Sequence, residues 1–196
     1  MEKIAREQAE PRTDTLVWGK NAVTELLNFV TEFERIGDYA VNIMEKAEEL
    51  NEKEASFSEN AQKELILLEK AVERILTVTG EAFEGDDTQK AMQVEPLEEV
   101  IDVMVERLRD QHIRRLKDGV CSIDTGVVFL DVLNNVERIS DHCSNVAVRM
   151  IGMEGGEDYD SHTLKSIMHH NPTKDYMLEY EECRKAYLVP LEEMEA

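Results

Sequence analysis

Apolar residues recur at steps of three and four along most of the chain, which is the spacing of one face of an α-helix. The first such stretch predicts one long helix that begins at Thr13 or Asp14, just after Pro11, and runs to about residue 50; Asn21 is an alternative start. Its apolar stripe consists of Val23, Leu26, Val30, Phe33, Gly37, Ala40, Met44 and Ala47.

Three further helices are predicted at about residues 58–83, 87–117 and 124–151. Ser58 is the expected N-cap of the first of them, and Pro96 is expected to interrupt or kink the second. A glycine marks each expected C-terminal end, namely Gly85, Gly119 and Gly152.

The chain after Gly152 has a different character. The sequence GMEGGEDYD (residues 152–160) predicts an acidic linker, and two short amphipathic stretches follow it, separated by HHNPT (residues 169–173). We expect this tail to be a weak independent folding unit. No run alternates with period two, so strands are not expected and the predicted fold class is an all-α bundle.

Two nine-residue stretches of the chain share five of their nine residues. ERIGDYAVN (residues 34–42) recurs as ERISDHCSN (residues 137–145), at an offset of 103. At this offset, Leu27, Val30, Glu34, Arg35, Ile36, Asp38 and Asn42 correspond to Leu130, Leu133, Glu137, Arg138, Ile139, Asp141 and Asn145. Such long-range similarity indicates a duplicated helical unit, with about three helices in each copy.

Each copy carries two carboxylates four residues apart, Glu34 with Asp38 and Glu137 with Asp141. Residues at this spacing lie on one ridge of a helix, where like charges repel unless a cation neutralises them. Oxygen-only ligand sets suit hard or intermediate cations. A solvated acidic face is the alternative for any single pair. The recurrence of the pair within an apolar ridge favours a metal site.

Charge and cysteine content restrict the class of protein. The formal net charge is −21, from 43 acidic and 22 basic residues, which argues against nucleic acid as a partner. The three cysteines are odd in number and lack CxxC spacing, so we expect a reducing, cytoplasmic compartment. No apolar run approaches a membrane span, and residues 1–10 are too charged for a signal peptide.

The paired stretches closely resemble the signature of PhoU-like domains over about residues 1–152. The resemblance implies two three-helix repeats, each with an E(D)xxxD motif associated with metal clusters, and a second acidic pair on the preceding helix. Glu95 and Glu99, followed by Asp102, match that second pair. Helical periodicity alone would not select them, since they point away from the stripe that contains Leu97 and Ile101. The implied cofactor is a divalent or trivalent ion: iron, manganese, magnesium or zinc.

The offset also predicts that the first repeat is truncated at its N-terminus. Subtracting 103 from Glu95 and Glu99 gives positions before Met1, so the first repeat would lack its partner acids. We therefore expect a remnant of the first repeat at residues 1–50, a second repeat at 56–152, and a linker and tail at 153–196. The second site (Glu95, Glu99, Glu137, Asp141) would be complete, and Glu34 with Asp38 would be half a site. An uncovered first helix would expose apolar surface, which favours a homodimer.

PhoU-like domains occur as free regulators of phosphate uptake and as the cytoplasmic C-terminal part of Na⁺/phosphate cotransporter family proteins. The segment DYMLEYEECRKAYLVP (residues 175–190) resembles the tail of the second group. The main prediction is therefore a regulatory domain that modulates phosphate transport at the inner face of the membrane. Its partner would be a transmembrane transporter part, in the same chain or a separate one. A stand-alone regulator and a structural module without metal are the alternatives.

No feature of the sequence predicts an enzyme. A di-iron oxidase would need Glu-x-x-His pairs on two helices, and none of the five histidines has a glutamate three residues before it. The adjacent His169 and His170 are expected to be solvated, and His142 need not share a ligand set with Asp141. Cys143 falls on the buried stripe of its helix, where a packed thiol is expected.

Overall fold

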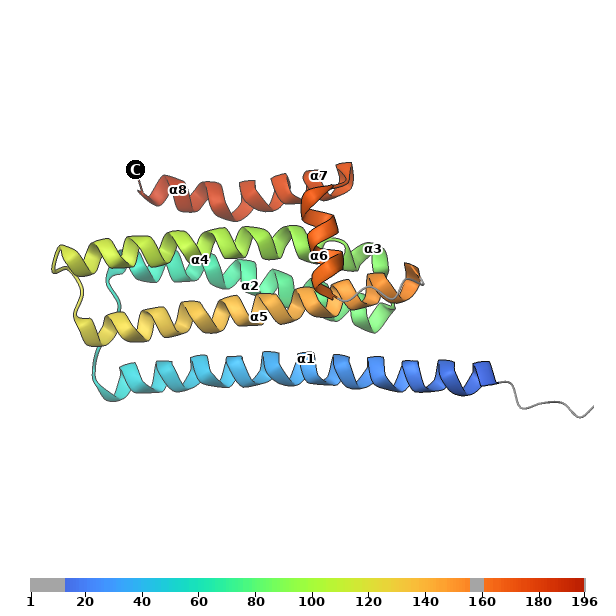
Figure 1. The fold of residues 1–196 in the computed structure, drawn as a ribbon. Coiled ribbons are helices and arrows are strands. Elements are labelled where there is room, and N and C mark those ends of the chain that lie inside the picture. The colour runs from blue at the N-terminus through green and yellow to red at the C-terminus, as the bar shows by residue number, and fades with distance from the viewer. Residues whose placement is uncertain (1–12, 156–160, 196) are drawn as a thin grey trace, which may run out of the picture. The chain divides into compact units, whose positions relative to one another are not determined.

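The computed structural model describes residues 13–155 and 161–195, and within them it contains helices and no strand (Figure 1). The predicted all-α fold class is confirmed. The elements are α1 (Thr13–Glu52), α2 (Glu59–Gly85), α3 (Thr88–Ala91), α4 (Val94–Lys117), α5 (Ile123–Gly155), α6 (Ser161–His170), α7 (Lys174–Cys183), the π-helical turn η1 (Arg184–Leu188) and α8 (Val189–Glu195). Among these described helices, none is both long enough and apolar enough to cross a bilayer.

The chain divides into two compact units, Met1–Thr31 and Glu32–Ala196. The described part of the first unit is a stretch of α1, in which Thr31 Oγ1 donates a hydrogen bond to the Leu27 carbonyl oxygen at 2.9 Å. The second unit holds the rest of α1 and all later helices. The predicted boundaries at residues 50, 56 and 152 remain predictions, and most of the predicted linker lies outside the described residues.

Helix ends follow the local sequence in most places. The Ser58 hydroxyl accepts a hydrogen bond from the Ala61 amide at 3.4 Å and caps α2 as predicted. Gly119, with φ of 70°, follows α4 in the left-handed region that glycine favours. The prediction that Gly152 ends α5 was wrong, because this helix continues to Gly155. Helix propensity only disfavours an interior glycine and does not forbid it.

Pro96 does not interrupt a helix, which corrects a second expectation. The break lies at Met92 and Gln93, between α3 and α4, and Pro96 sits in the first turn of α4. The first backbone N–H groups of a helix have no intrahelical acceptor, so a proline without that N–H is tolerated there.

The core lies where α2, α4 and α5 pack against one another. Large apolar side chains that are almost fully buried fill it: Leu68, Ile75, Leu97, Ile101, Met104, Leu108, Phe129 and Leu133. Cys143 is also fully buried, as expected for a packed thiol, and burial raises its pKa to about 12. Burying this apolar surface is the main force that holds the three helices together.

Most of the predicted stripe of α1 does not pack in the second unit, although Phe33 contacts Phe83 with ring centroids 4.9 Å apart. Gly37, Ala40 and Met44 are exposed, with Met44 at 53%. The opposite face meets α5 largely through polar contacts: Lys46 Nζ lies 3.0 Å from Asp131 Oδ2, and Asn42 Nδ2 donates to Asn135 Oδ1 at 3.2 Å. The apolar period thus identified the helix, but polar pairing with α5 decided its orientation.

The C-terminal tail is part of the bundle rather than a weak separate unit. Helix α7 and η1 pack against α4, and α8 contacts α2 (Figure 1). Tyr176, Cys183, Leu188 and Leu191 are buried by this packing.

We expect Leu191→Ala to lower the free energy of unfolding of the whole domain by about 2–5 kcal/mol, because it leaves a cavity at a fully buried position. Chemical denaturation followed by circular dichroism measures this. Met194→Ala, at a side chain that is 50% exposed, is the control and should change little. Equal, negligible effects of both variants would show that the tail does not contribute to the core.

Candidate metal centre

Three acids line the buried side of α4. Glu95, Glu98 and Asp102 follow one another at steps of three and four, so they form one ridge of the helix. Glu95 is 1% exposed and Glu98 is 5% exposed, although fully buried acids are rare unless they are paired. Glu98 and Asp102 have the same Glu-x-x-x-Asp spacing as Glu137 and Asp141. That spacing is the signal by which sequence reasoning could have found them.

Glu95 is held by partners from two other helices. Ser144 Oγ of α5 donates a hydrogen bond to Glu95 Oε2, and His169 Nε2 of α6 lies 2.9 Å from Glu95 Oε1. His169 is exposed, as expected, but its ring also contacts this buried carboxylate. No local pattern reveals this contact, because 74 positions separate the two residues.

Glu98 and Asp102 have fewer partners than their burial demands. Lys165 Nζ of α6 lies 3.5 Å from Glu98 Oε1, and Asp102 Oδ1 is buried with no hydrogen-bond partner in the described structure. Burial, followed by the charges of Glu95 and Asp102, raises the pKa of Glu98 to about 8. A cation placed here would stabilise both carboxylates in their ionised form.

Glu137 and Asp141 of α5 approach this ridge from the other side. After burial, their charges are the largest contributions that raise the pKa of Asp102, to about 6. Both side chains are half-exposed, and each forms an ion pair with an arginine. Arg109 Nη2 lies 3.0 Å from Glu137 Oε2, and Arg138 Nη1 lies 3.2 Å from Asp141 Oδ2. The structure thus brings Glu95, Glu98 and Asp102 together with Glu137 and Asp141.

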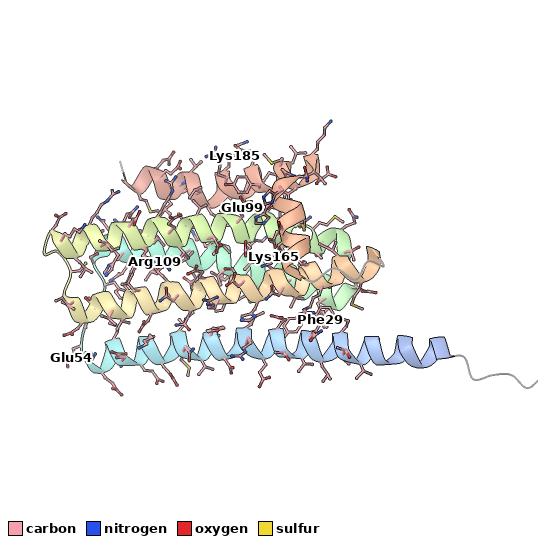
Figure 2. The ribbon with its side chains drawn as sticks, viewed as in Figure 1. Phe29, Glu54, Glu99, Arg109, Lys165 and Lys185 are labelled. Carbon is pink, nitrogen blue, oxygen red and sulfur yellow. The ribbon has the colours of Figure 1, made fainter. Side chains whose placement is uncertain are left out.

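Glu99 points away from these acids. Its Oε2 accepts a hydrogen bond from Tyr176 Oη of α7 at 2.7 Å, on the side of α4 that the tail covers (Figure 2). One helical position changes the direction of a side chain by about 100°, which separates Glu99 from its neighbour Glu98. The structure therefore does not bring Glu99 to the position expected of a ligand.

Glu34 and Asp38 are both exposed. The carboxylate of α1 that faces α5 is instead Glu32, whose Oε2 lies 2.6 Å from His142 Nδ1 and accepts a hydrogen bond from Asn145 Nδ2 at 3.2 Å. The proposal that Glu34 and Asp38 form half a site stays a prediction. Sequence reasoning missed Glu32, which has no counterpart in the repeated motif.

The acid cluster does not form a metal site as it stands. Among the described side chains, no three His, Cys, Asp or Glu groups already converge at metal-binding geometry. The unpartnered Asp102 oxygen and the raised pKa values of Glu98 and Asp102 nevertheless indicate uncompensated negative charge. Lys165 contributes the positive charge nearest to Glu98. An ion would require these side chains to turn toward it and Lys165 to withdraw.

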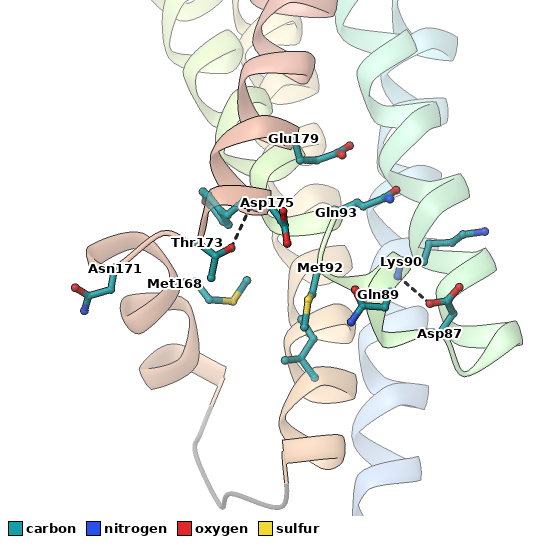
Figure 3. A pocket seen from close by; sticks show the side chains of 12 residues that line it. Asp87, Gln89, Lys90, Met92, Gln93, Met168, Asn171, Thr173, Asp175 and Glu179 are labelled. Carbon is teal, nitrogen blue, oxygen red and sulfur yellow. Dashed lines mark hydrogen bonds between the residues drawn. The ribbon is translucent and has the colours of Figure 1, made fainter.

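A cavity of about 610 Å³ lies beside this region, between α3, the end of α5, α6 and α7 (Figure 3). Tyr176, which holds Glu99, is one of its walls. Met92 and Met168 provide apolar surface, while Asp175 and Glu179 make part of the rim acidic. The cavity therefore shares a wall with the tail that covers α4.

Comparison with known proteins shows which proteins this region resembles. Residues 65–150 match the family model described as PhoU domain. The chain is 28% identical over 136 residues to the phosphate-specific transport system accessory protein PhoU homolog 1 of Thermotoga maritima, covering 69% of this chain and 58% of the relative. It is 26% identical over 138 residues to the corresponding PhoU homolog of Streptococcus pneumoniae, covering 70% and 62%.

A PhoU homolog of Clostridium acetobutylicum is 24% identical over 134 residues, covering 68% of this chain and 60% of the relative. The chain thus spans less than two thirds of the length of these relatives. No solved structure matches it significantly. The predicted resemblance to PhoU-like domains is confirmed over residues 65–150, and the resemblance to the cotransporter tail stays a prediction.

Proposed function

We propose that the protein is an accessory regulator of phosphate transport, because residues 65–150 match the family model described as PhoU domain. The named relatives are accessory proteins of phosphate-specific transport systems, which favours the stand-alone regulator over the cotransporter domain first expected. The observation that carries the proposal is that the matched segment contains the whole α4–α5 acid cluster. A transmembrane phosphate transporter is the proposed partner, met at the cytoplasmic face of the membrane.

The proposed regulatory ligand is a metal ion. Glu98 and Asp102 of α4 with Glu137 and Asp141 of α5 would hold it, and Glu95 would support them through Ser144. Iron, manganese, magnesium and zinc are the candidates for this oxygen-rich set. A bound cation supplies positive charge that neutralises the facing carboxylates of the two helices. Glu99 is left out of this ligand set because it is hydrogen-bonded to Tyr176.

The C-terminal tail would couple metal binding at the acid cluster to contact with a partner. Lys165 and His169 of α6 contact Glu98 and Glu95, and Tyr176 of α7 contacts Glu99. Occupation of the cluster would release Lys165 from Glu98, and the docking of α6 would then weaken. The surface that the tail presents to the transporter would change with it. No catalytic residue is needed for such a role.

Two other parts of the early prediction remain proposals. The cotransporter reading rested on residues 175–190, which form parts of α7, η1 and α8 against the bundle. The homodimer reading gains support from the outward face of α1 in the second unit, where Val41 is 49% and Met44 is 53% exposed.

Deletion of the gene in its host, followed by measurement of phosphate uptake, tests the regulatory role. We expect uptake to change severalfold at a given external phosphate concentration, and the wild-type gene to restore it. The variant E98Q/D102N should fail to restore regulation, whereas E99Q should succeed. Unchanged uptake after deletion would contradict the regulatory role. Full restoration by E98Q/D102N would contradict only the metal ligands and would favour a module without metal.

A further inference from the structure

A second cavity lies at the end of the bundle that holds the α1–α2 and α4–α5 loops (Figure 1). Its volume is about 360 Å³, within the size range of small-ligand sites. No acidic residue lines it, although the chain contains 43 acids. Its polar walls are hydroxyl groups, a thiol and one imidazole, from Ser56, Ser58, Cys121, Ser122, Thr125 and His112.

His112 is the buried group that points to a missing ligand. It is 2% exposed, and neither ring nitrogen has a hydrogen-bond partner in the described structure. The ring stacks on Phe129, with centroids 4.6 Å apart. Burial lowers the pKa of His112 and the charge of Arg115 lowers it further, while the Gly126 backbone acts in the opposite direction. A neutral imidazole offers one donor and one acceptor, and an unmade buried hydrogen bond is costly.

Unpartnered polar atoms concentrate around this histidine. Arg115 packs over the same Phe129 ring, at 5.5 Å from its centroid, and its Nε and Nη2 are buried without partners. Glu64 Oε2 is also unpartnered, while Glu64 Oε1 accepts a 2.6 Å hydrogen bond from Arg115 Nη1. His112, Arg115 and Glu64 together hold five buried polar atoms without a hydrogen-bond partner among the described residues.

Two long helices begin at this cavity. Ser58 and Ala61 line it at the start of α2, and Ser122 and Thr125 line it at the start of α5. The N-terminus of a helix carries partial positive charge and backbone N–H groups that bind anions. In addition, the last turn of α4 carries three basic residues, Arg114, Arg115 and Lys117.

Glu64 is the buried carboxylate near this end, and Arg115 neutralises its charge through the 2.6 Å ion pair. The other two acids are exposed. Glu59, in the first turn of α2, has a side chain 82% exposed and is paired with Lys63. Asp124, in the first turn of α5, is exposed and contributes to the raised pKa of Lys53. A metal ion is a poor occupant, because His112 and Cys121 are the only residues of metal-ligand type in the lining and Arg115 places positive charge nearby.

We propose that this cavity binds a small tetrahedral oxyanion, with inorganic phosphate as the ligand. A phosphate oxygen would accept a hydrogen bond from the N–H of the one His112 ring nitrogen that faces the cavity. The hydroxyl groups of Ser122 and Thr125 and the backbone amides at the starts of α2 and α5 would surround the remaining oxygens. This inference goes beyond the proposed function and does not depend on the α4–α5 acid cluster.

The test measures the thermal stability and phosphate affinity of the full chain, wild type and His112→Phe. Phenylalanine keeps a ring against Phe129 and removes both unpartnered nitrogens. We expect inorganic phosphate at millimolar concentration to raise the Tm of the wild type by several degrees. His112→Phe should bind phosphate at least about tenfold more weakly, since it cannot hydrogen-bond to the anion, while its Tm without phosphate is unchanged or higher.

Control measurements distinguish specific phosphate binding from non-specific stabilisation by anions and from binding of a phosphorylated organic ligand. His170→Phe, at an exposed histidine, should keep the wild-type response to phosphate. Sulfate, which also stabilises proteins by exclusion from their surface, should produce a clearly smaller shift than phosphate. Equal shifts with sulfate, or equal responses of His112→Phe and wild type, would overturn the proposal. A response to glycerol 3-phosphate alone would replace free phosphate by a phosphorylated organic ligand. Metal affinity, measured in parallel, should be unaffected by His112→Phe.

Discussion

Replacing Glu98 and Asp102 by their amides (E98Q/D102N) is expected to weaken metal binding by about 100-fold or more. These two carboxylates face Glu137 and Asp141, and Asp102 Oδ1 has no other partner in the described structure. Amides keep the shape but lose the charge that attracts the ion, and even outer-shell changes cost about 10–100-fold in affinity. Isothermal titration of metal-stripped protein with Mn²⁺, Fe²⁺, Mg²⁺ and Zn²⁺ measures the effect and identifies the preferred ion.

Two variants serve as controls for this titration. E99Q changes the adjacent residue, whose carboxylate is held by Tyr176, and should retain the wild-type affinity. E34Q/D38N changes the repeated pair on α1, which is exposed, and should cause a smaller loss than E98Q/D102N. If E99Q were as damaging as E98Q/D102N, the ligand assignment from the structure would be wrong and the pair predicted from the sequence would be favoured.

The metal-free protein is expected to lose stability between about pH 4.5 and 8 because of Glu98. Its pKa is raised from 4.5 to about 8, so the folded state holds a proton that the unfolded state releases over this range. The stabilising contribution is fully present below pH 4.5 and is lost as the pH rises through about 8. At about 1.4 kcal/mol per pKa unit, the loss is about 3–5 kcal/mol. Urea denaturation at a series of pH values measures it.

Glu98→Gln should flatten this dependence, since glutamine carries no proton to lose. Glu49→Gln is a control of opposite sign, because Lys53 and Lys46 lower the pKa of Glu49 and its contribution is lost as the pH falls. A saturating metal ion should reverse the trend in the wild type, as it favours the ionised carboxylates. An unchanged pH slope in Glu98→Gln would show that this carboxyl is solvated rather than buried.

The helices themselves were largely predictable from local information. The period of apolar residues located α1, α2 and α5 to within a few residues and predicted α3 and α4 as one helix. Ser58 and Gly119 marked ends correctly because a cap and a left-handed turn depend only on neighbouring residues. Pro96 and Gly152 led to wrong helix ends. Proline is tolerated in the first turn of a helix, where Pro96 lies, and glycine is tolerated inside a long packed helix such as α5.

The candidate site was predictable in part. The repeated motif pointed to Glu137 and Asp141, and the resemblance pointed to α4, the helix whose acids face them; their role as metal ligands stays a prediction. The choice between Glu98 and Glu99 depended on which side of α4 faces α5, and the sequence contains two adjacent glutamates there. The contacts of His169 with Glu95 and of Lys165 with Glu98 could not be predicted, because the docking of the tail leaves no periodic pattern in the sequence.

The sequence by itself determined that this protein is a helical bundle with duplicated carboxylate pairs, because helix period and motif spacing are properties of the chain alone. Only the tertiary structure decided which acids share one environment, how the tail covers them, and that the buried His112 ring nitrogens have no hydrogen-bond partner among the described residues. The physical reason is that burial and the electrostatic influence of one residue on another depend on distances between helices that are far apart in the chain.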